Sequence, residues 1–105
     1  GKVKTMTRMF CGAGSFNQNI KGWDTHNLEE ASFMFCEAAS FNQPLQAWNT
    51  KNLKYAESTF NCARSFRHSL AGWNTSSLVL AGKMFVRSGV ADLFKSNRNL
   101  LRDWE

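Results

Sequence analysis

Few side chains in this chain of 105 residues have types and spacings suited to catalysis. Its only imidazoles, His26 and His68, lie far apart in the sequence, and a histidine acts as a general base only beside a group that it can activate. The chain has no G-x-S-x-G nucleophile motif, no G-x-x-x-x-G-K phosphate loop and no H-E-x-x-H zinc motif. The sequence therefore predicts a protein that is not an enzyme and that uses no cofactor.

The formal net charge of +5 is the next feature that could direct binding. Residues 61–102 hold seven of the 13 basic residues and one acidic residue, Asp92. These basic residues are dispersed rather than contiguous, which is typical of a solvated face. We therefore expect a non-catalytic module that binds a protein or a glycan. The alternative is a nucleic-acid-binding module that uses this basic C-terminal third.

An internal repeat of 25 residues organises the chain. Writing the sequence in lines of that length places residues of one type in the same column. The clearest columns are Phe10, Phe35, Phe60 and Phe85; Phe16, Phe41 and Phe66; Trp23, Trp48 and Trp73; and Thr25, Thr50 and Thr75. So many columns in register indicate a repeat protein, in which each unit packs on its neighbours.

Each unit is predicted to contain one short strand and one short helix. Alternating inward and outward residues predict strands near 20–25, 45–50 and 70–75. Apolar residues spaced by three and four predict helices beginning near 28, 53 and 78, with N-caps at Asn27, Asn52 and Ser77. The predicted fold class is an α/β repeat: a leucine-rich-repeat-like, right-handed solenoid of about three and a half coils, with one short parallel strand and one short helix per repeat and a C-terminal capping helix.

The second unit carries a specific motif: Met34-Phe35, then Ser40-Phe41-Asn42-Gln43, then Trp48-Asn49-Thr50. This pattern resembles the repeat of bacterial and mycoplasma surface lipoproteins, whose usual form reads MFxGASSFNQDLSSWDTSNVTDM and which is grouped with BspA-like leucine-rich repeats. The resemblance implies a parallel-strand solenoid, a cell-surface or extracellular setting, and binding rather than catalysis. The third unit departs from the motif, because Arg67-His68 replaces Asn-Gln.

The positions that follow each tryptophan form the candidate binding strip, which we call the outward strip. Its members are Asp24, His26, Asn49, Lys51, Asn74 and Ser76. One interpretation is a flat polar face that binds a protein or a glycan. The other, which we favour slightly for the Asp/Asn positions, is that these side chains bond nearby backbone N–H groups. No metal site is expected, because one carboxylate among three such positions supplies too little charge for Ca²⁺.

The tryptophan column is expected to be a buried ladder whose indole N–H groups bond backbone carbonyls, rather than a ligand platform. The side-chain amides of Asn17-Gln18 and Asn42-Gln43 are expected to bond backbone groups between successive coils.

Cys11, Cys36 and Cys62 are expected to be free thiols. On adjacent helices Cys11 and Cys36 would lie about 8–10 Å apart, beyond the roughly 7 Å that a disulfide allows between Cα atoms.

The two ends of the array are predicted to differ. Residues 1–89 form the repeat array, and residues 90–105 form an amphipathic helix that caps it or docks on a partner. No apolar run approaches the roughly 18 residues of a membrane span. The chain begins in mid-repeat, so we expect the N-terminal face, with Met9 and Phe10 in its first layer, to be partly apolar. Either more repeats precede it in the full protein, or a partner protein or a neighbouring chain covers that face. The candidate docking residues at the two ends are Val3, Met6, Leu93, Phe94, Leu101 and Trp104.

Overall fold

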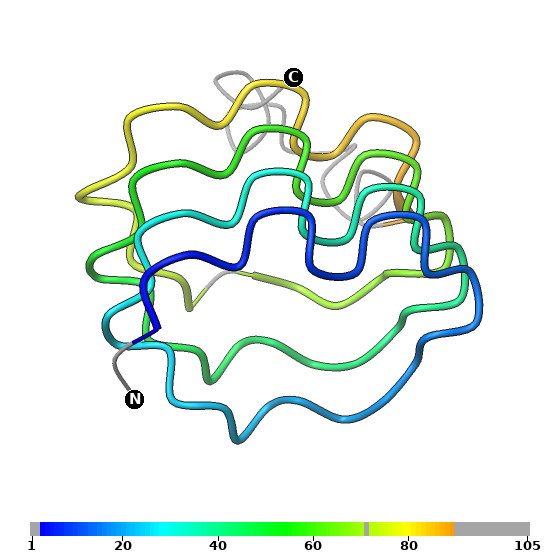
Figure 1. Ribbon diagram of the computed structural model, residues 1–105, viewed down its shortest axis with the longest axis horizontal. Helices are drawn as coiled ribbons and strands as arrows, with labels where there is room; N and C mark the ends of the chain where they lie inside the picture. The colour runs from blue at the N-terminus through cyan, green and yellow to red at the C-terminus, as the bar shows by residue number, and fades with distance from the viewer. Residues whose placement is uncertain (1–2, 71, 90–105) are drawn as a thin grey trace.

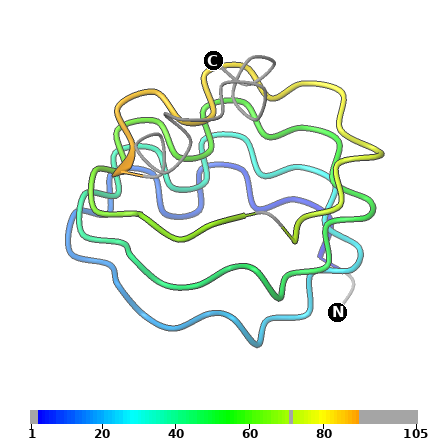
Figure 2. The same ribbon diagram turned by 180° about the vertical axis from the view of Figure 1, so that it is seen from behind.

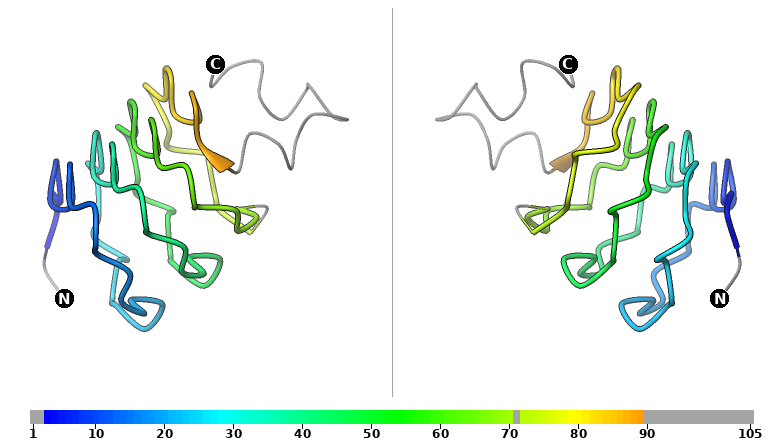
Figure 3. Two further views of the ribbon diagram at one scale, coloured as in Figure 1. Left: turned by 90° about the vertical axis from the view of Figure 1, so that its right-hand side faces the viewer. Right: turned by 90° about the vertical axis from the view of Figure 1, so that its left-hand side faces the viewer.

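The computed structural model describes residues 3–70 and 72–89, which wind into successive coils of 25 residues (Figure 1). We number them coil 1 (3–27), coil 2 (28–52), coil 3 (53–77) and coil 4 (78–89). Neighbouring coils are in register, because isolated parallel bridges join Thr5 to Glu30, Glu30 to Tyr55, and Tyr55 to Leu80. The view from behind and the two side views show the coils lying one against the next (Figures 2 and 3).

The predicted fold class is wrong. Among the described residues there is no α-helix and no strand longer than a single bridge, and the only 3₁₀ residue is Gly89. The segments 20–25, 45–50 and 70–75 are not strands, and no helix begins near 28, 53 or 78. The chain is instead a compact body, with a Cα radius of gyration of 12.3 Å, built from turns rather than from one helix and one strand per repeat. The predicted capping helix at 90–105 lies outside the described residues.

Consecutive turns occupy the place of each predicted helix. In coil 2, Met34 N–H donates to Ala31 O, and Ala38 N–H donates to Phe35 O. The N–H groups of Phe35 and Glu37 donate to coil 3 instead, to Thr59 O at 2.9 Å and to Asn61 O at 2.7 Å. An α-helix needs each N–H for the carbonyl four residues back, so donors used between coils cannot build one. Turns that reach three residues back produce the same apolar spacing, which explains the wrong prediction.

These turns place two residues per coil in the left-handed region. In coil 2 they are Phe33, at φ 60°, and Glu37, at φ 61°. The equivalent residues of the other coils are Arg8, Gly12, Ser58, Cys62, Lys83 and Arg87. A type II turn requires positive φ at its third residue, where glycine is usual. Only one of these eight positions is glycine, so the turn signal was missing from the sequence.

The other side of coils 1–3 runs nearly straight (Figure 1), and no backbone hydrogen bond joins its described residues to those of the next coil. The stacked rings are also more widely spaced on this side. Phe10 and Phe35, on the turn side, stack with centroids 5.5 Å apart, whereas Trp23 and Trp48, on the straight side, are 6.5 Å apart. Side chains join the coils there instead.

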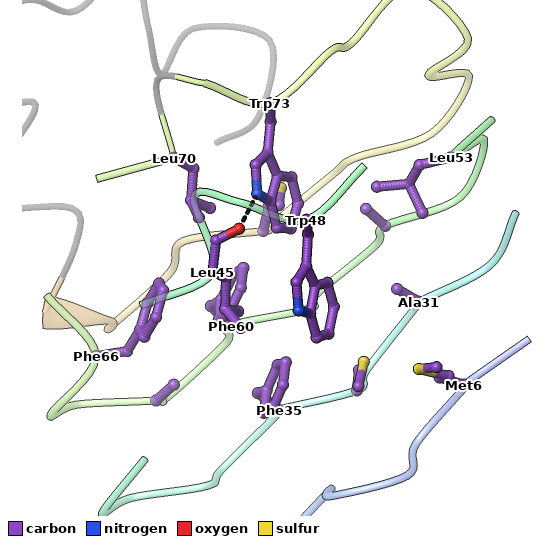
Figure 4. Packing of buried hydrophobic residues seen from close by; sticks show 14 of the residues in the cluster. Met6, Ala31, Phe35, Leu45, Trp48, Leu53, Phe60, Phe66, Leu70 and Trp73 are labelled. Carbon is purple, nitrogen blue, oxygen red and sulfur yellow. Dashed lines mark hydrogen bonds between the residues drawn. The ribbon is translucent and has the colours of Figure 1, made fainter. Parts of the chain in front are cut away.

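The aromatic columns form the core between the two sides of each coil (Figure 4). Phe35, Phe41, Phe60 and Phe66 are fully buried. Trp48 and Trp73 confirm the predicted ladder: their indole N–H groups donate to Ile20 O at 3.0 Å and to Leu45 O at 2.9 Å. The indole N–H of each of these two tryptophans therefore donates to a backbone carbonyl of the preceding coil. Trp23 occupies the same column but is exposed.

Candidate interaction surface

The outward strip makes mainly local hydrogen bonds. Asn49 Oδ1 accepts from Lys51 N–H at 3.1 Å, and Asn74 Oδ1 accepts from both the N–H and the hydroxyl of Ser76. Asp24 Oδ1 accepts from His26 N–H in the same way. These are the bonds that the local-turn interpretation predicts. A binding role for the strip stays a prediction.

Asp24 and His26 form the one charged pair of the strip. The His26 Nδ1 and Asp24 Oδ1 atoms are 2.5 Å apart, and both side chains are exposed. The hydrogen bond from the His26 side chain is the largest of the effects that hold the pKa of the Asp24 carboxyl well below its usual value. The carboxylate is therefore present at neutral pH and fixes the imidazole. The pair has no equivalent in coils 2 and 3, where asparagine replaces the aspartate.

Threonine hydroxyls fix the strip to the neighbouring coil. Thr25 Oγ1 donates to Asn49 O and accepts from Asn49 N–H, and Thr50 Oγ1 makes the same two bonds with Asn74. Both threonines are buried. Each hydroxyl thus supplies two hydrogen bonds between coils at a place where backbone groups do not bond one another. The strip is rigid because its backbone is hydrogen-bonded to these buried threonines.

The Asn-Gln positions join coils as predicted. Asn17 Oδ1 accepts from Asn42 N–H at 2.8 Å, and Gln43 Nε2 donates to Asn17 O. The departure in coil 3 preserves the arrangement: Arg67 N–H donates to Asn42 Oδ1, and His68 Nε2 lies 3.2 Å from Asn42 O. His68 therefore replaces the glutamine amide in a structural contact.

The residues predicted as helix N-caps do not cap helices. Asn52 Nδ2 donates to His26 O, and Ser77 Oγ donates to Lys51 O, each at 2.6 Å. In both cases the acceptor belongs to the preceding coil. This correction follows from the absence of helices, because no run of free helical N–H groups is present for these side chains to cap.

The exposed side of coil 1, facing away from coil 2, is the largest departure from the repeat pattern; we call it the N-terminal edge. Val3 is 47% exposed, whereas Leu28 in the same column is 1% exposed. Met9 is 48% exposed and Trp23 is 39% exposed, against 0% for Met34 and 4% for Trp48. Met9 and Trp23 have the same residue types as their buried equivalents, so their exposure comes from their position at the edge of the described coils.

The candidate docking residues are not all on this edge. Val3 is exposed there, but Met6 is buried within the core and is not available to a partner. The prediction that Met9 lies on a partly apolar face is confirmed, whereas Trp23 was expected to be buried and is exposed instead. Leu93, Phe94, Leu101 and Trp104 lie outside the described residues.

The three cysteines are free and partly buried. The reason given for Cys11 and Cys36 is wrong, because these residues are not on helices: Gly12 N–H donates to Cys36 O at 2.8 Å, so the two backbones are in contact. Burial, with a smaller contribution from the Cys11 thiol, raises the pKa of the Cys36 thiol to about 11. Within residues 3–70 and 72–89, no group of three or more His, Cys, Asp or Glu side chains could hold a metal ion.

The basic residues of the described C-terminal part are exposed but dispersed. Arg64 and Arg67 belong to coil 3, and Lys83 and Arg87 to coil 4. Lys83 and Arg87 occupy the two left-handed turn positions of their coil. None of the described segments forms a helix with the length and apolar character needed to span a bilayer.

The 25-residue register, the aromatic columns and the turn-built coils together define a repeat module whose coils stack in register. The family described as "Mycoplasma protein of unknown function, DUF285" matches residues 1–103. The chain belongs to this family. No characterised protein and no solved structure matches the chain.

Proposed function

We propose that this chain is a non-catalytic interaction module that binds a protein partner through its N-terminal edge. The observation that carries the proposal is the contrast within columns: Val3, Met9 and Trp23 are exposed where their equivalents are buried. Phe10 and Phe16, which stack at 3.9 Å, are also only partly buried. Exposed apolar side chains gathered at one edge of a domain are typical of an interaction site.

The family supports a location at the cell surface, as part of a larger surface-associated protein or assembly. The motif of coil 2 resembles the repeats of mycoplasma surface lipoproteins and their BspA-like relatives, and the family match covers almost the whole chain. A glycan is the second class of ligand for the outward strip, since the strip is polar and rigid. Fold and family do not by themselves define a ligand.

Site-specific photocrosslinking in cells that make the protein tests the proposal. A benzophenone amino acid replaces Met9 on the N-terminal edge and, as the matched control, Tyr55, which is 37% exposed away from that edge. We expect a discrete protein adduct at position 9 and none at position 55. Equal labelling at both positions, or no adduct at position 9, would contradict the proposal.

A salt titration separates this proposal from nucleic-acid binding. Binding to a labelled 20-nucleotide DNA, single- or double-stranded, is measured by fluorescence anisotropy between 50 and 200 mM salt. Phosphate-driven binding falls steeply over this range, by about 10³-fold or more for six or more contacts. We expect no saturable DNA binding near 150 mM salt. Saturable binding that Arg64→Gln and Arg87→Gln weaken would favour the nucleic-acid alternative.

A further inference from the structure

Two of the three cysteines lie level with each other on neighbouring coils. Cys11 of coil 1 and Cys36 of coil 2 are separated by one repeat of 25 residues, like the residues that the parallel bridges join. Just after Cys11, Gly12 N–H donates to Cys36 O at 2.8 Å, and just before it, Phe10 N–H donates to Met34 O at 2.9 Å. Backbone hydrogen bonds between the coils therefore hold this pair of positions in place from both sides.

The spacing of the coils at this level is within the reach of a disulfide. Paired backbones lie about 4.8 Å apart, and a disulfide needs Cα atoms about 4.4–6.8 Å apart. Phe10 and Phe35, the residues directly before the cysteines, stack with centroids 5.5 Å apart and planes 16° apart, so equivalent side chains at this level point the same way. A disulfide also brings its Cβ atoms to about 3.5–4.5 Å, so closure needs a local approach of about 1 Å.

Gly12 gives the backbone beside Cys11 the freedom for that approach. It is the only glycine among the eight described residues with positive φ, at φ 74°, and no atom lies within 4 Å of the place that its Cβ would take. Glycine permits backbone rotations that other residues resist. The equivalent residue of coil 2 is Glu37, so the adaptable peptide belongs to coil 1.

Both thiols are accessible from the outer surface of the turns. Cys11 and Cys36 are partly exposed, and so is Asn61, which occupies the same column in coil 3. Cys36 has a coil on either side, so its exposure does not depend on where coil 1 begins. Burial is the largest cause of the raised pKa of the Cys36 thiol, and a hydrogen bond with the Cys11 thiol is among the smaller ones. The two thiols therefore face each other.

Cys62 is placed differently from this pair. It comes one position later in its coil, in the column of Gly12 and Glu37, and it has a φ of 62°. Its thiol donates to Asn61 Oδ1 at 3.1 Å, within its own coil. Cys62 is therefore the internal control for the reactivity of a single, partly buried thiol.

We propose that Cys11 and Cys36 form a redox-modification site, at which a small-molecule disulfide converts the two thiols into a disulfide that joins coil 1 to coil 2. The Cys11 thiolate attacks one sulfur of the oxidant and forms a mixed disulfide, and the released thiolate takes up the proton that Cys11 lost. Cys36 then loses its proton and attacks the Cys11 sulfur, which releases the second thiol of the oxidant. Two protein thiols are thereby oxidised, and one disulfide is reduced to two thiols.

The order of attack follows from the environment of Cys36. Because burial raises the pKa of its thiol to about 11, Cys36 holds little thiolate at neutral pH. We therefore assign the first attack to Cys11. Formation of the mixed disulfide then removes the Cys11 thiol, which is one of the groups that raise the pKa of Cys36.

Thiol mapping on the folded full chain tests this proposal. The reduced chain is incubated with glutathione disulfide at neutral pH, the remaining thiols are blocked with N-ethylmaleimide, and peptide mass spectrometry locates the adducts and the cross-link. We expect all three cysteines to carry maleimide before oxidation, and Cys62 alone afterwards, with a Cys11–Cys36 cross-link that dithiothreitol reverses. Cys62→Ser should form the same cross-link, whereas Cys36→Ser should stop at the mixed disulfide of Cys11.

A comparison with the unfolded chain shows whether the fold creates the site. The ratio of cross-linked to reduced protein is measured at equilibrium in one glutathione buffer, with and without urea that unfolds the chain. We expect this ratio to be about tenfold or more higher in the folded chain, because the register holds the two thiols together. Equal ratios would overturn the proposal, as would a Cys36–Cys62 cross-link, a cross-link between chains, or a mixed disulfide of Cys11 that persists in the parent chain.

Discussion

At the scale of single residues, the unusual feature of this molecule is that residues other than glycine adopt positive φ. Seven such side chains lie in the turns, among them Glu37, whose N–H donates to Asn61 O at 2.7 Å. The left-handed region costs an L-residue about 1–2 kcal/mol. The chain tolerates this cost because hydrogen bonds between coils and buried rings fix the turns from both sides.

Replacing Glu37 by glycine should therefore stabilise the protein. At φ 61° the substitution removes the steric cost of Cβ, which exceeds the extra entropy that glycine gives the unfolded chain. We expect the free energy of unfolding in urea to rise by about 0.5–1 kcal/mol. Ala39→Gly, at an exposed position without positive φ, is the control and should lower it. A decrease in both variants would mean that the turn assignment is wrong.

Threonine hydroxyls make the second residue-level prediction. Thr50→Val removes a buried hydroxyl that bonds both Asn74 O and Asn74 N–H. Chemical denaturation should show a loss of about 1–3 kcal/mol, because two backbone groups lose their partner. Thr75→Val changes the same column at an exposed site and should change the free energy of unfolding by less than about 0.5 kcal/mol. Equal losses would show that the bridge between coils contributes nothing.

At the scale of the elements, the repeat was predictable and its secondary structure was not. Residue type in register predicted the ladder of Trp48 and Trp73 and the contacts of Asn17 and Asn42, because such columns depend only on which side chains lie side by side in successive coils. Helix and strand depend on where backbone N–H groups donate. A spacing of three and four fits a helix and a series of turns equally, and Glu37 gives no glycine signal for its turn.

The candidate sites were predictable to a similar extent. The local bonds of Asn49 and Asn74 follow from short side chains two residues before a free N–H. The direction of the backbone hydrogen bonds between coils could not be inferred, because side-chain patterns do not show which way a carbonyl points. The exposure of Met9 was predicted, and that of Trp23 could have been inferred from the same place in the first unit.

Gly89, at the end of coil 4, tests how that element packs on coil 3. A Cβ on Gly89 would lie 2.7 Å from Phe66 O and 2.8 Å from Arg64 O, atoms of the backbone that cannot turn aside. Gly89→Ala should therefore lower the free energy of unfolding by about 1–3 kcal/mol. Gly82→Ala, where no atom lies within 4 Å of the new Cβ, should leave it nearly unchanged. If thermal unfolding of the two variants coincides, coil 4 does not pack on coil 3 at Gly89.

At the scale of the whole molecule, hydrogen bonds that run mainly in one direction organise the stack of coils. N–H groups of coil 1, such as those of Met6 and Arg8, donate to carbonyls of coil 2, and the same pattern recurs between coils 2 and 3 and between coils 3 and 4. Each coil is therefore stabilised by its immediate neighbours, as in other repeat proteins.

Hydrogen exchange of matched positions tests this account most directly. Amide and indole exchange rates are measured by NMR for Lys4, Thr5 and Trp23 in coil 1, and for their equivalents Glu29, Glu30 and Trp48 in coil 2. The account predicts rapid exchange for the three coil 1 groups and slow exchange for the three coil 2 groups, which donate to the preceding coil. Equal protection of both sets, or rapid exchange of both, would contradict the stacked register and its open edge.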